Sequence, residues 1–176
     1  MTIEMWLQAI SEDSPCGLNL EDDLDFLSLE EASRGKPATE YRKDDGEVIR
    51  IDGEAPHWPT VQSVAESLLN RSKDLRLAVY LTRALLHTTG FTGVVEGLAL
   101  IDGLLERYWD NVHPELDADD DNDPTMRLNA LSPLSSADAV IGDLRSSYLL
   151  QSRSRGQLTV RELEIALGRL TVDADA

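Results

Sequence analysis

The feature that most constrains the fold is a helical pattern of apolar residues over residues 58–112. In its first part these residues recur at steps of three and one, which places them on one helical face: Val61, Val64, Ala65, Leu68 and Leu69. Its second part, residues 75–86, is apolar on nearly every side, as expected of the most buried helix in a bundle. The pattern predicts helices packed around one central helix.

Start and stop residues divide this pattern into separate helices. Trp58 precedes Pro59, and proline is favoured at a first helical position. Ser72 is a good N-cap residue, so we expect it to begin the central helix. Gly90 is expected to end that helix, since glycine readily adopts the backbone conformation that follows a last helical turn.

A third long helix is expected from about Gly93 to Asn111, where apolar residues step by four and three alternately. Gly97 lies inside it, and a glycine there is costly unless a neighbouring backbone approaches closely. Shorter helices are expected in four other segments, at residues 23–34, from residue 124, at 137–149 and at 160–170.

The segment 36–56 breaks the helical pattern with glycines, prolines and many charges. Alternation around Ile49 and Ile51 allows a short strand or hairpin, and a mobile surface loop is the alternative. Together the segments predict an all-α fold, an antiparallel bundle of about six to eight helices in one domain over residues 1–176.

Charge excludes several classes of partner. The chain has 33 acidic residues against 16 Lys and Arg, a formal net charge of −17. Phosphates require cations, so nucleic acid is not an expected partner, and an anionic membrane surface would repel the chain. The first residues do not resemble a signal peptide, and membrane insertion is not expected because no run of 18 apolar residues occurs.

No segment carries a recognisable catalytic, cofactor or metal site. Asp117 begins an acidic run with calcium-loop spacing, but Asn122 and Leu128 replace the required glycine and glutamate. The three histidines lie far apart, at positions 57, 87 and 113. Cys16, the only cysteine, has no recognisable base and is expected to be a small buried side chain. The sequence therefore predicts no enzyme.

Three cations are expected to form internal ion pairs. Lys73 and Arg76 stand at a helix start, where the helix dipole disfavours cations, so a nearby carboxylate or the acidic loop is expected to hold them. Arg127 is expected to reach Asp110 or the loop aspartates. Trp58 and Trp109 are expected to be largely buried anchors.

These motifs together resemble the N-terminal domain of the TssA (ImpA-type) proteins of bacterial type VI secretion, over about residues 14–165. The residues that carry the resemblance are Pro15, Cys16, Gly17, Trp58, Ser72, Lys73, Asp74, Leu75, Arg76, Gly90, Gly93, Gly97, Trp109, Asp110, His113, Pro114 and Arg127. We interpret them as framework residues first, with contact to a partner left open.

The resemblance implies a cytoplasmic, non-enzymatic assembly factor that contacts baseplate, tube or sheath proteins of the secretion machine. It also implies a C-terminal ring-forming domain that has no counterpart in this sequence, so the domain alone is expected to be a monomer or weak dimer. Two other functions remain as alternatives, a small enzyme or metal-binding protein with an acidic site and an acidic mimic of nucleic acid.

Overall fold

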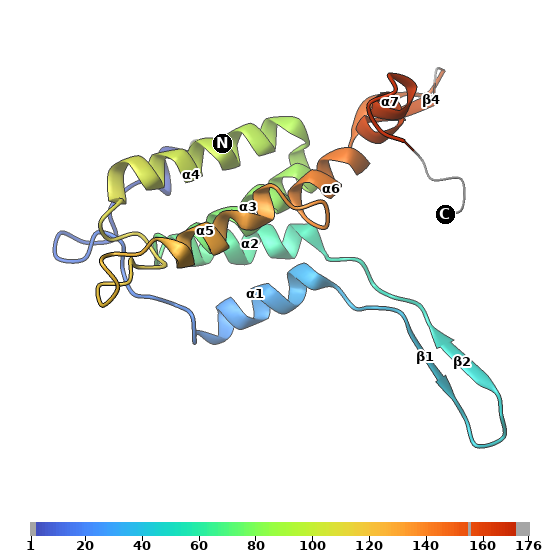
Figure 1. Cartoon of the computed structure of the whole chain (residues 1–176), viewed down its shortest axis with the longest axis horizontal. Helices are drawn as coiled ribbons and strands as arrows, with labels where there is room; N and C mark the ends of the chain where they lie inside the picture. Colours follow the sequence, from blue (N-terminus) through green and yellow to red (C-terminus); the bar gives the residue numbers. More distant parts are fainter. Residues whose placement is uncertain (1–2, 155, 172–176) are drawn as a thin grey trace.

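The structure is a computed structural model that describes residues 3–154 and 156–171. Its body consists of four helices that pack in chain order: α1 (Leu24–Arg34), α2 (Trp58–Leu69), α3 (Leu75–Thr89) and α4 (Phe91–Tyr108). Each packs on the next, and Figure 1 shows them as a stack with α3 between α2 and α4. The predicted central helix over residues 75–86 is confirmed.

Local capping explains where these helices begin and end. Asp74, not Ser72, is the N-cap of α3, because its carboxylate accepts the Arg76 N–H at 2.7 Å. Ser72 lies two residues earlier, in the buried segment that leads to the helix. Gly90, with a φ of 74°, ends α3 and begins α4, so α4 starts before the predicted Gly93.

The core follows from the apolar character of α3. Leu75, Leu77, Leu81 and Leu85 are fully buried, and they pack with residues of α1, α2 and α4 in one cluster. Helix α4 lies close to α3, since a Cβ on Gly97 would stand 2.8 Å from the Thr82 Cα. Any larger residue there would force the two helices apart.

Three short helices complete the helical part. Helix α5 (Thr125–Leu131) follows Pro124 as predicted, and a 3-10 turn, η2 (Ser132–Leu134), leads towards α6 (Val140–Ser146). Both α5 and α6 pack on α3. Another 3-10 turn, η1 (Ile3–Met5), contacts α4, and α7 (Val160–Ala166) contacts α6.

The prediction of an all-α fold is wrong, because two antiparallel hairpins interrupt the helices. Strands β1 (Thr39–Arg42) and β2 (Val48–Ile51) form the first, which realises the hairpin alternative for segment 36–56. Strands β3 (Tyr148–Ser152) and β4 (Gly156–Thr159) form the second. The fold is therefore mixed, with seven α-helices and four strands among the described residues.

The second hairpin was missed because residues 148–150 look like the apolar end of a helix. Instead α6 ends at Ser146, and Ser147 adopts an extended backbone. The hydroxyls of Ser146 and Ser147 bond to the carbonyls of Gly142 and Asp143, which competes with further helical hydrogen bonds. Gly156, with a φ of 84°, then provides the start of β4. Within the described part of the chain, no helix is long and apolar enough to cross a membrane.

Candidate functional site

Three segments that are distant in sequence, residues 16–17, 72–76 and 112–114, meet with Arg127 of α5 in a buried polar arrangement, which we call the junction. The backbone of Lys73 lies at its centre: its N–H donates to the Cys16 carbonyl at 2.7 Å, and its carbonyl accepts the His113 N–H at 3.0 Å. The Leu75 N–H in turn donates to the His113 carbonyl at 2.8 Å. The junction thus joins the N-terminal segment, the start of α3 and the end of α4.

Lys73 is a buried cation without a carboxylate partner in the described part of the chain. Its side chain is 1% exposed, and its ammonium donates to the Leu69 carbonyl at 2.9 Å. Burial lowers the pKa of Lys73 to about 8. The predicted ion pair of this residue is wrong, because the end of α2 supplies a backbone carbonyl in place of a carboxylate.

Cys16 is buried beside Lys73, as predicted for a small core side chain. Burial raises the pKa of its thiol to about 11, although the positive charge of Lys73 acts in the opposite direction. A thiol held in its protonated form is a poor nucleophile. The junction therefore offers no activated cysteine.

Arg76 does have the predicted nearby carboxylate. Its guanidinium forms an ion pair with Asp74 at 2.8 Å and a second with Glu21 at 3.3 Å. It also lies over the ring of Phe26, with the guanidinium carbon 4.8 Å from the ring centroid. Burial opposes its charge, but the bonds to Asp74 prevail and raise the pKa of Arg76.

Arg127 closes the junction from α5. It is 1% exposed and donates to the backbone carbonyls of Pro114 at 2.8 Å, Val112 at 2.9 Å and Trp109. The predicted pairing with Asp110 or the acidic loop is wrong. The carbonyls after α4 lack helical partners, so a cation there satisfies several of them at once.

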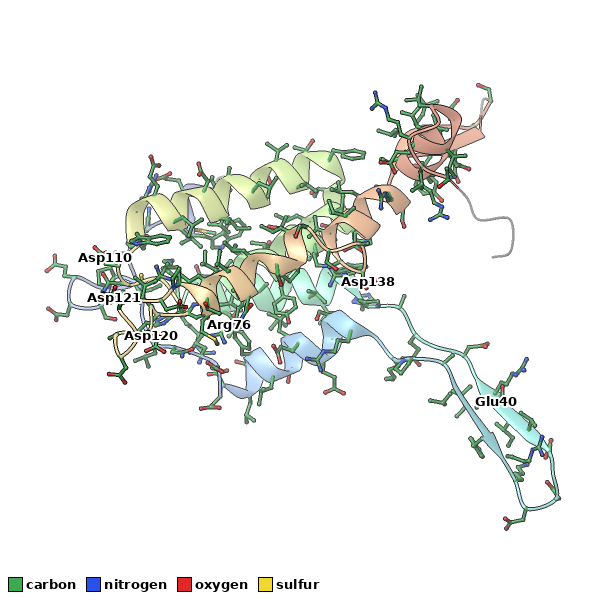
Figure 2. All side chains as sticks on the ribbon, viewed as in Figure 1. Glu40, Arg76, Asp110, Asp120, Asp121 and Asp138 are labelled. Carbon is green, nitrogen blue, oxygen red and sulfur yellow. The ribbon has the colours of Figure 1, made fainter. Side chains whose placement is uncertain are left out.

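The remaining motif residues lie outside the segments that form the junction. Trp109 is 48% exposed, with its ring centroid 4.9 Å from the buried Arg127 guanidinium carbon, so its predicted burial is wrong. Asp110 is exposed, and Figure 2 labels it together with Asp120 and Asp121 of the acidic loop. In residues 3–154 and 156–171, no three His, Cys, Asp or Glu side chains are grouped in a way that suits a metal ion. Pro15 is half-buried, Gly93 packs against α3, and Trp58 lies in the groove described next.

An open groove of about 820 Å³ runs along the outer face of α3. Its floor is formed by α3, which contributes the buried Val79 and four residues spaced four, three and four apart: Arg76, Tyr80, Arg83 and His87. Helix α1 forms one wall, and α5, η2 and α6 form the other, with Met126 and Asp138 among the lining residues. Arg76 and Asp138, labelled in Figure 2, both line this groove.

One end of the groove is built around Trp58. His87 stacks on its ring, with 4.1 Å between centroids and an angle of 4°. The guanidinium carbon of Arg83 lies 5.1 Å from the centroid of the Trp58 ring. Asp143 of α6 bonds to Arg83 at 2.7 Å and to His87 at 3.2 Å.

These bonds decide the charge of Asp143. Burial opposes its ionisation, but the hydrogen bonds from His87 and Arg83 prevail and lower the pKa of Asp143. An ionised carboxylate held by two partners is a structural anchor between α3 and α6.

The groove was not identified from the sequence. The apolar character of α3 on nearly every side hides the polar residues that form the groove floor. The spacing of Arg76, Tyr80, Arg83 and His87 carried the signal, since these four residues define one polar and aromatic face of an otherwise apolar helix. The walls come from α1, α5 and α6, whose positions no local pattern shows.

Fold and site together define a mixed domain of helices and two hairpins, with a buried polar junction and an open groove on one face. The family model described as "ImpA, N-terminal, type VI secretion system" matches residues 7–136. This chain therefore belongs to the ImpA N-terminal family of the type VI secretion system. That membership confirms the resemblance on which the sequence analysis rested.

Two relatives agree with this assignment. The chain is 40% identical over 168 residues to the type VI secretion system component TssA1 of Pseudomonas aeruginosa, covering 96% of this chain and 47% of that protein. It is also similar to a solved structure, the N-terminal domain including the conserved ImpA_N region of the TssA component from Burkholderia cenocepacia. That match has a TM-score of 0.71 and 33% identity, covering 95% of this chain and 58% of the other. The chain thus spans about half the length of the curated relative.

Proposed function

We propose that this chain is a non-enzymatic protein-interaction domain that contacts baseplate, tube or sheath proteins during assembly of a type VI secretion machine in the cytoplasm. The family supports a role in that machine. The groove along α3 is the observation that supports a protein-interaction surface on this domain. In this proposal the motif residues of the junction hold the framework, and the groove binds the partner.

The composition of the groove favours a protein segment as its ligand. Its charged side chains are largely satisfied within the chain, as the Arg83–Asp143 and Arg76–Asp74 pairs show. The accessible lining combines apolar and aromatic surface, including Met126, which is 50% exposed, with the exposed polar residues Arg34, Asn129 and Asp138. A concave apolar surface with fixed polar groups at its edges suits the apolar side chains of a partner helix or loop.

The net charge of −17 adds a preference for a partner with a basic surface. Long-range attraction of this kind raises the rate of encounter, and it weakens with ionic strength. Because the chain covers about half of its curated relative, we propose that it forms one domain of a longer assembly factor. Ring formation would then depend on parts other than this domain.

A matched pair of variants on α5 tests the groove. Met126 lines it and is 50% exposed, whereas Leu128 is 62% exposed and does not line it. Both sites tolerate a charge in the folded state because both are exposed. We expect Met126→Glu to weaken binding to the baseplate, tube or sheath protein that the unaltered domain captures by about 10-fold, and Leu128→Glu to leave it within about twofold.

The measurement is calorimetry or surface plasmon resonance with purified secretion components, after circular dichroism confirms that each variant is folded. Absence of binding to every baseplate, tube and sheath component would contradict the proposed function. Equal effects of the two substitutions would move the binding surface away from the groove.

A further inference from the structure

The hairpin β1–β2 extends away from the helical body as an arm, which we define as residues 36–54. Figure 1 shows it projecting from the ends of α1 and α2. Its base is closed by Lys36 and Glu54, which exchange two backbone hydrogen bonds of 2.8 Å and form an ion pair of 2.8 Å. Of the eight strand residues only Ile49 is half-buried, and the others are exposed. An isolated two-stranded hairpin of this kind is marginally stable in water.

The arm has two chemically different faces. The register pairs Thr39 with Ile51 and Tyr41 with Ile49, which places these four side chains on one largely apolar face. The other face carries Glu40, Arg42, Val48 and Arg50. Glu40 and Arg50 form an ion pair of 2.8 Å on that face, while no ion pair of Arg42 is found in the part of the chain that the structure describes.

The outer edge of β1 has a defined hydrogen-bonding pattern. The Lys43 N–H donates to the Glu47 carbonyl at 2.8 Å, which makes this a hydrogen-bonded pair. Antiparallel pairs alternate, so Tyr41–Ile49 bonds across the hairpin, while the backbones of Glu40 and Arg42 face outward. Glu40 and Arg42 therefore present the free donors and acceptors of this edge.

We propose that β1 of one copy pairs antiparallel with β1 of a second copy, centred on Tyr41, so that two arms form a four-stranded sheet. In this register Glu40 of each copy lies opposite Arg42 of the other. The backbone N–H and C=O groups of both residues face outward, so the two residues exchange backbone hydrogen bonds. Arg42 thereby gains a carboxylate partner, which the described residues of its own chain do not supply.

Charge selects this register over its neighbours. Shifting the second strand by two residues in one direction places Glu40 opposite Glu40. The same shift in the other direction places Arg42 opposite Arg42 and Glu40 opposite Asp44. Like charges directly opposite one another destabilise a sheet. A shift by one residue is excluded, because it would set outward-facing backbone groups against inward-facing ones.

Charge also explains why the arm is the place where two copies meet. It contains four cations and six carboxylates, a net charge of −2, whereas the whole chain carries −17. The contacting strand itself, with one Glu and one Arg, is neutral. Two bodies of the same sign repel each other least when they approach through a neutral projection. The contact is small, so it is weak alone and strengthened when copies are held together.

Disulfide trapping tests this pairing directly. Tyr41 of the two copies would form a non-hydrogen-bonded pair with Cα atoms about 4.5 Å apart, within the range of a disulfide. We expect Tyr41→Cys to form a disulfide-linked dimer about 10-fold faster than Ile51→Cys under the same oxidant. Ile51 is a matched control, since it is 53% exposed against 51% for Tyr41 but lies on the far strand. Cys16 is buried and stays in place in both variants.

Charge substitutions in the Tyr41→Cys background test the register. Arg42→Glu is expected to slow dimer formation to the rate of the Ile51→Cys control, because it sets two carboxylates opposite each other. Adding Glu40→Arg and Arg50→Glu exchanges all three charges and is expected to restore the fast rate. Equal rates for Tyr41→Cys and Ile51→Cys, an unchanged rate with Arg42→Glu, or failure of the triple exchange to restore it would each overturn the proposal.

Discussion

The junction and the groove both use residues of α3, but they place charged groups in opposite situations. In the junction, Lys73 and Arg127 are 1% exposed and donate to backbone carbonyls of α2 and of the segment after α4. In the groove, Arg83 is paired with the carboxylate of Asp143 and borders open space. The first region fixes where chain segments lie, and the second presents a shaped surface.

This difference distinguishes motif residues that maintain the fold from residues that contact a partner. The motif residues from Ser72 to Arg76, with His113 and Arg127, lie almost entirely within the junction, where a partner has little access. The groove contains only Trp58, Arg76 and Pro114 from the motif set. In our account the motif therefore reports the family framework, while the partner contact involves groove residues outside it.

The largest effect is expected from Arg127→Ala. The substitution leaves three carbonyls without their charged donor and removes a buried side chain between α5 and the segment that follows α4. We expect a loss of about 3–5 kcal/mol in the free energy of unfolding, measured by urea denaturation. Arg107→Ala is the control, since it removes an exposed pair with Glu4 and should cost less than about 1 kcal/mol. Equal losses in the two variants would contradict the framework role of Arg127.

A smaller effect is expected from Asp143→Asn on the groove side. The substitution weakens the bonds to Arg83 and His87, and we expect a loss of about 1.5–3 kcal/mol at neutral pH. The pKa of Asp143 is lowered in the folded state, so its contribution is present above its ordinary pKa of 3.8 and is lost as the pH falls below that value. Urea denaturation at pH 7 and pH 3 measures this. A loss that is independent of pH would show that charge is not the cause.

Lys73→Met is expected to have a modest effect at neutral pH, because an apolar side chain of similar volume replaces a buried cation. Its signature is pH dependence. The pKa of Lys73 is about 8 in the folded state against an ordinary 10.5, so between these values the unfolded chain binds more protons. The stability of the unaltered chain should therefore rise relative to Lys73→Met from about pH 8 to pH 10.5. Cys16 has a raised pKa with the opposite effect on stability, and its titration depends on the charge of Lys73, so both proteins are measured with Cys16→Ala. A constant difference across this range would contradict the buried, uncompensated state of Lys73.

The smallest effect is expected in the arm. Arg50→Ala removes an exposed ion pair with Glu40 on a hairpin that projects from the body. We expect a change below about 0.5 kcal/mol in global stability, measured by thermal unfolding. A loss above 1 kcal/mol would mean that the arm is coupled to the helical core.

The sequence predicted what depends on neighbours along the chain. The buried helix α3, the stop at Gly90, the helix after Pro124 and the end of α1 before Gly35 all follow from local patterns. The hairpin β3–β4 does not, since an apolar run at residues 148–150 suits a helix end and a strand equally well. The hydroxyls of Ser146 and Ser147 and the positive φ of Gly156 favour the hairpin over a longer helix.

The site was harder to predict because it depends on distant segments. The sequence predicted that Lys73 and Arg127 need partners. Their partners are backbone carbonyls, which every residue has, so they cannot be recognised from the sequence. The environment of Trp109 likewise involves a distant residue, since its exposed ring lies against the buried guanidinium of Arg127. The groove requires α1, α5 and α6 to stand around α3, and only tertiary packing supplies that arrangement.

The most direct test of the central claim compares one junction variant with one groove variant on two readouts, unfolding free energy and affinity for the captured secretion component. We predict that Lys73→Met changes the pH dependence of stability but leaves affinity within about twofold, while Met126→Glu leaves stability nearly unchanged and weakens affinity by about 10-fold. If Lys73→Met abolished binding while the domain stayed folded, and Met126→Glu bound normally, the assignment of the motif to the framework and of the groove to the partner would be contradicted.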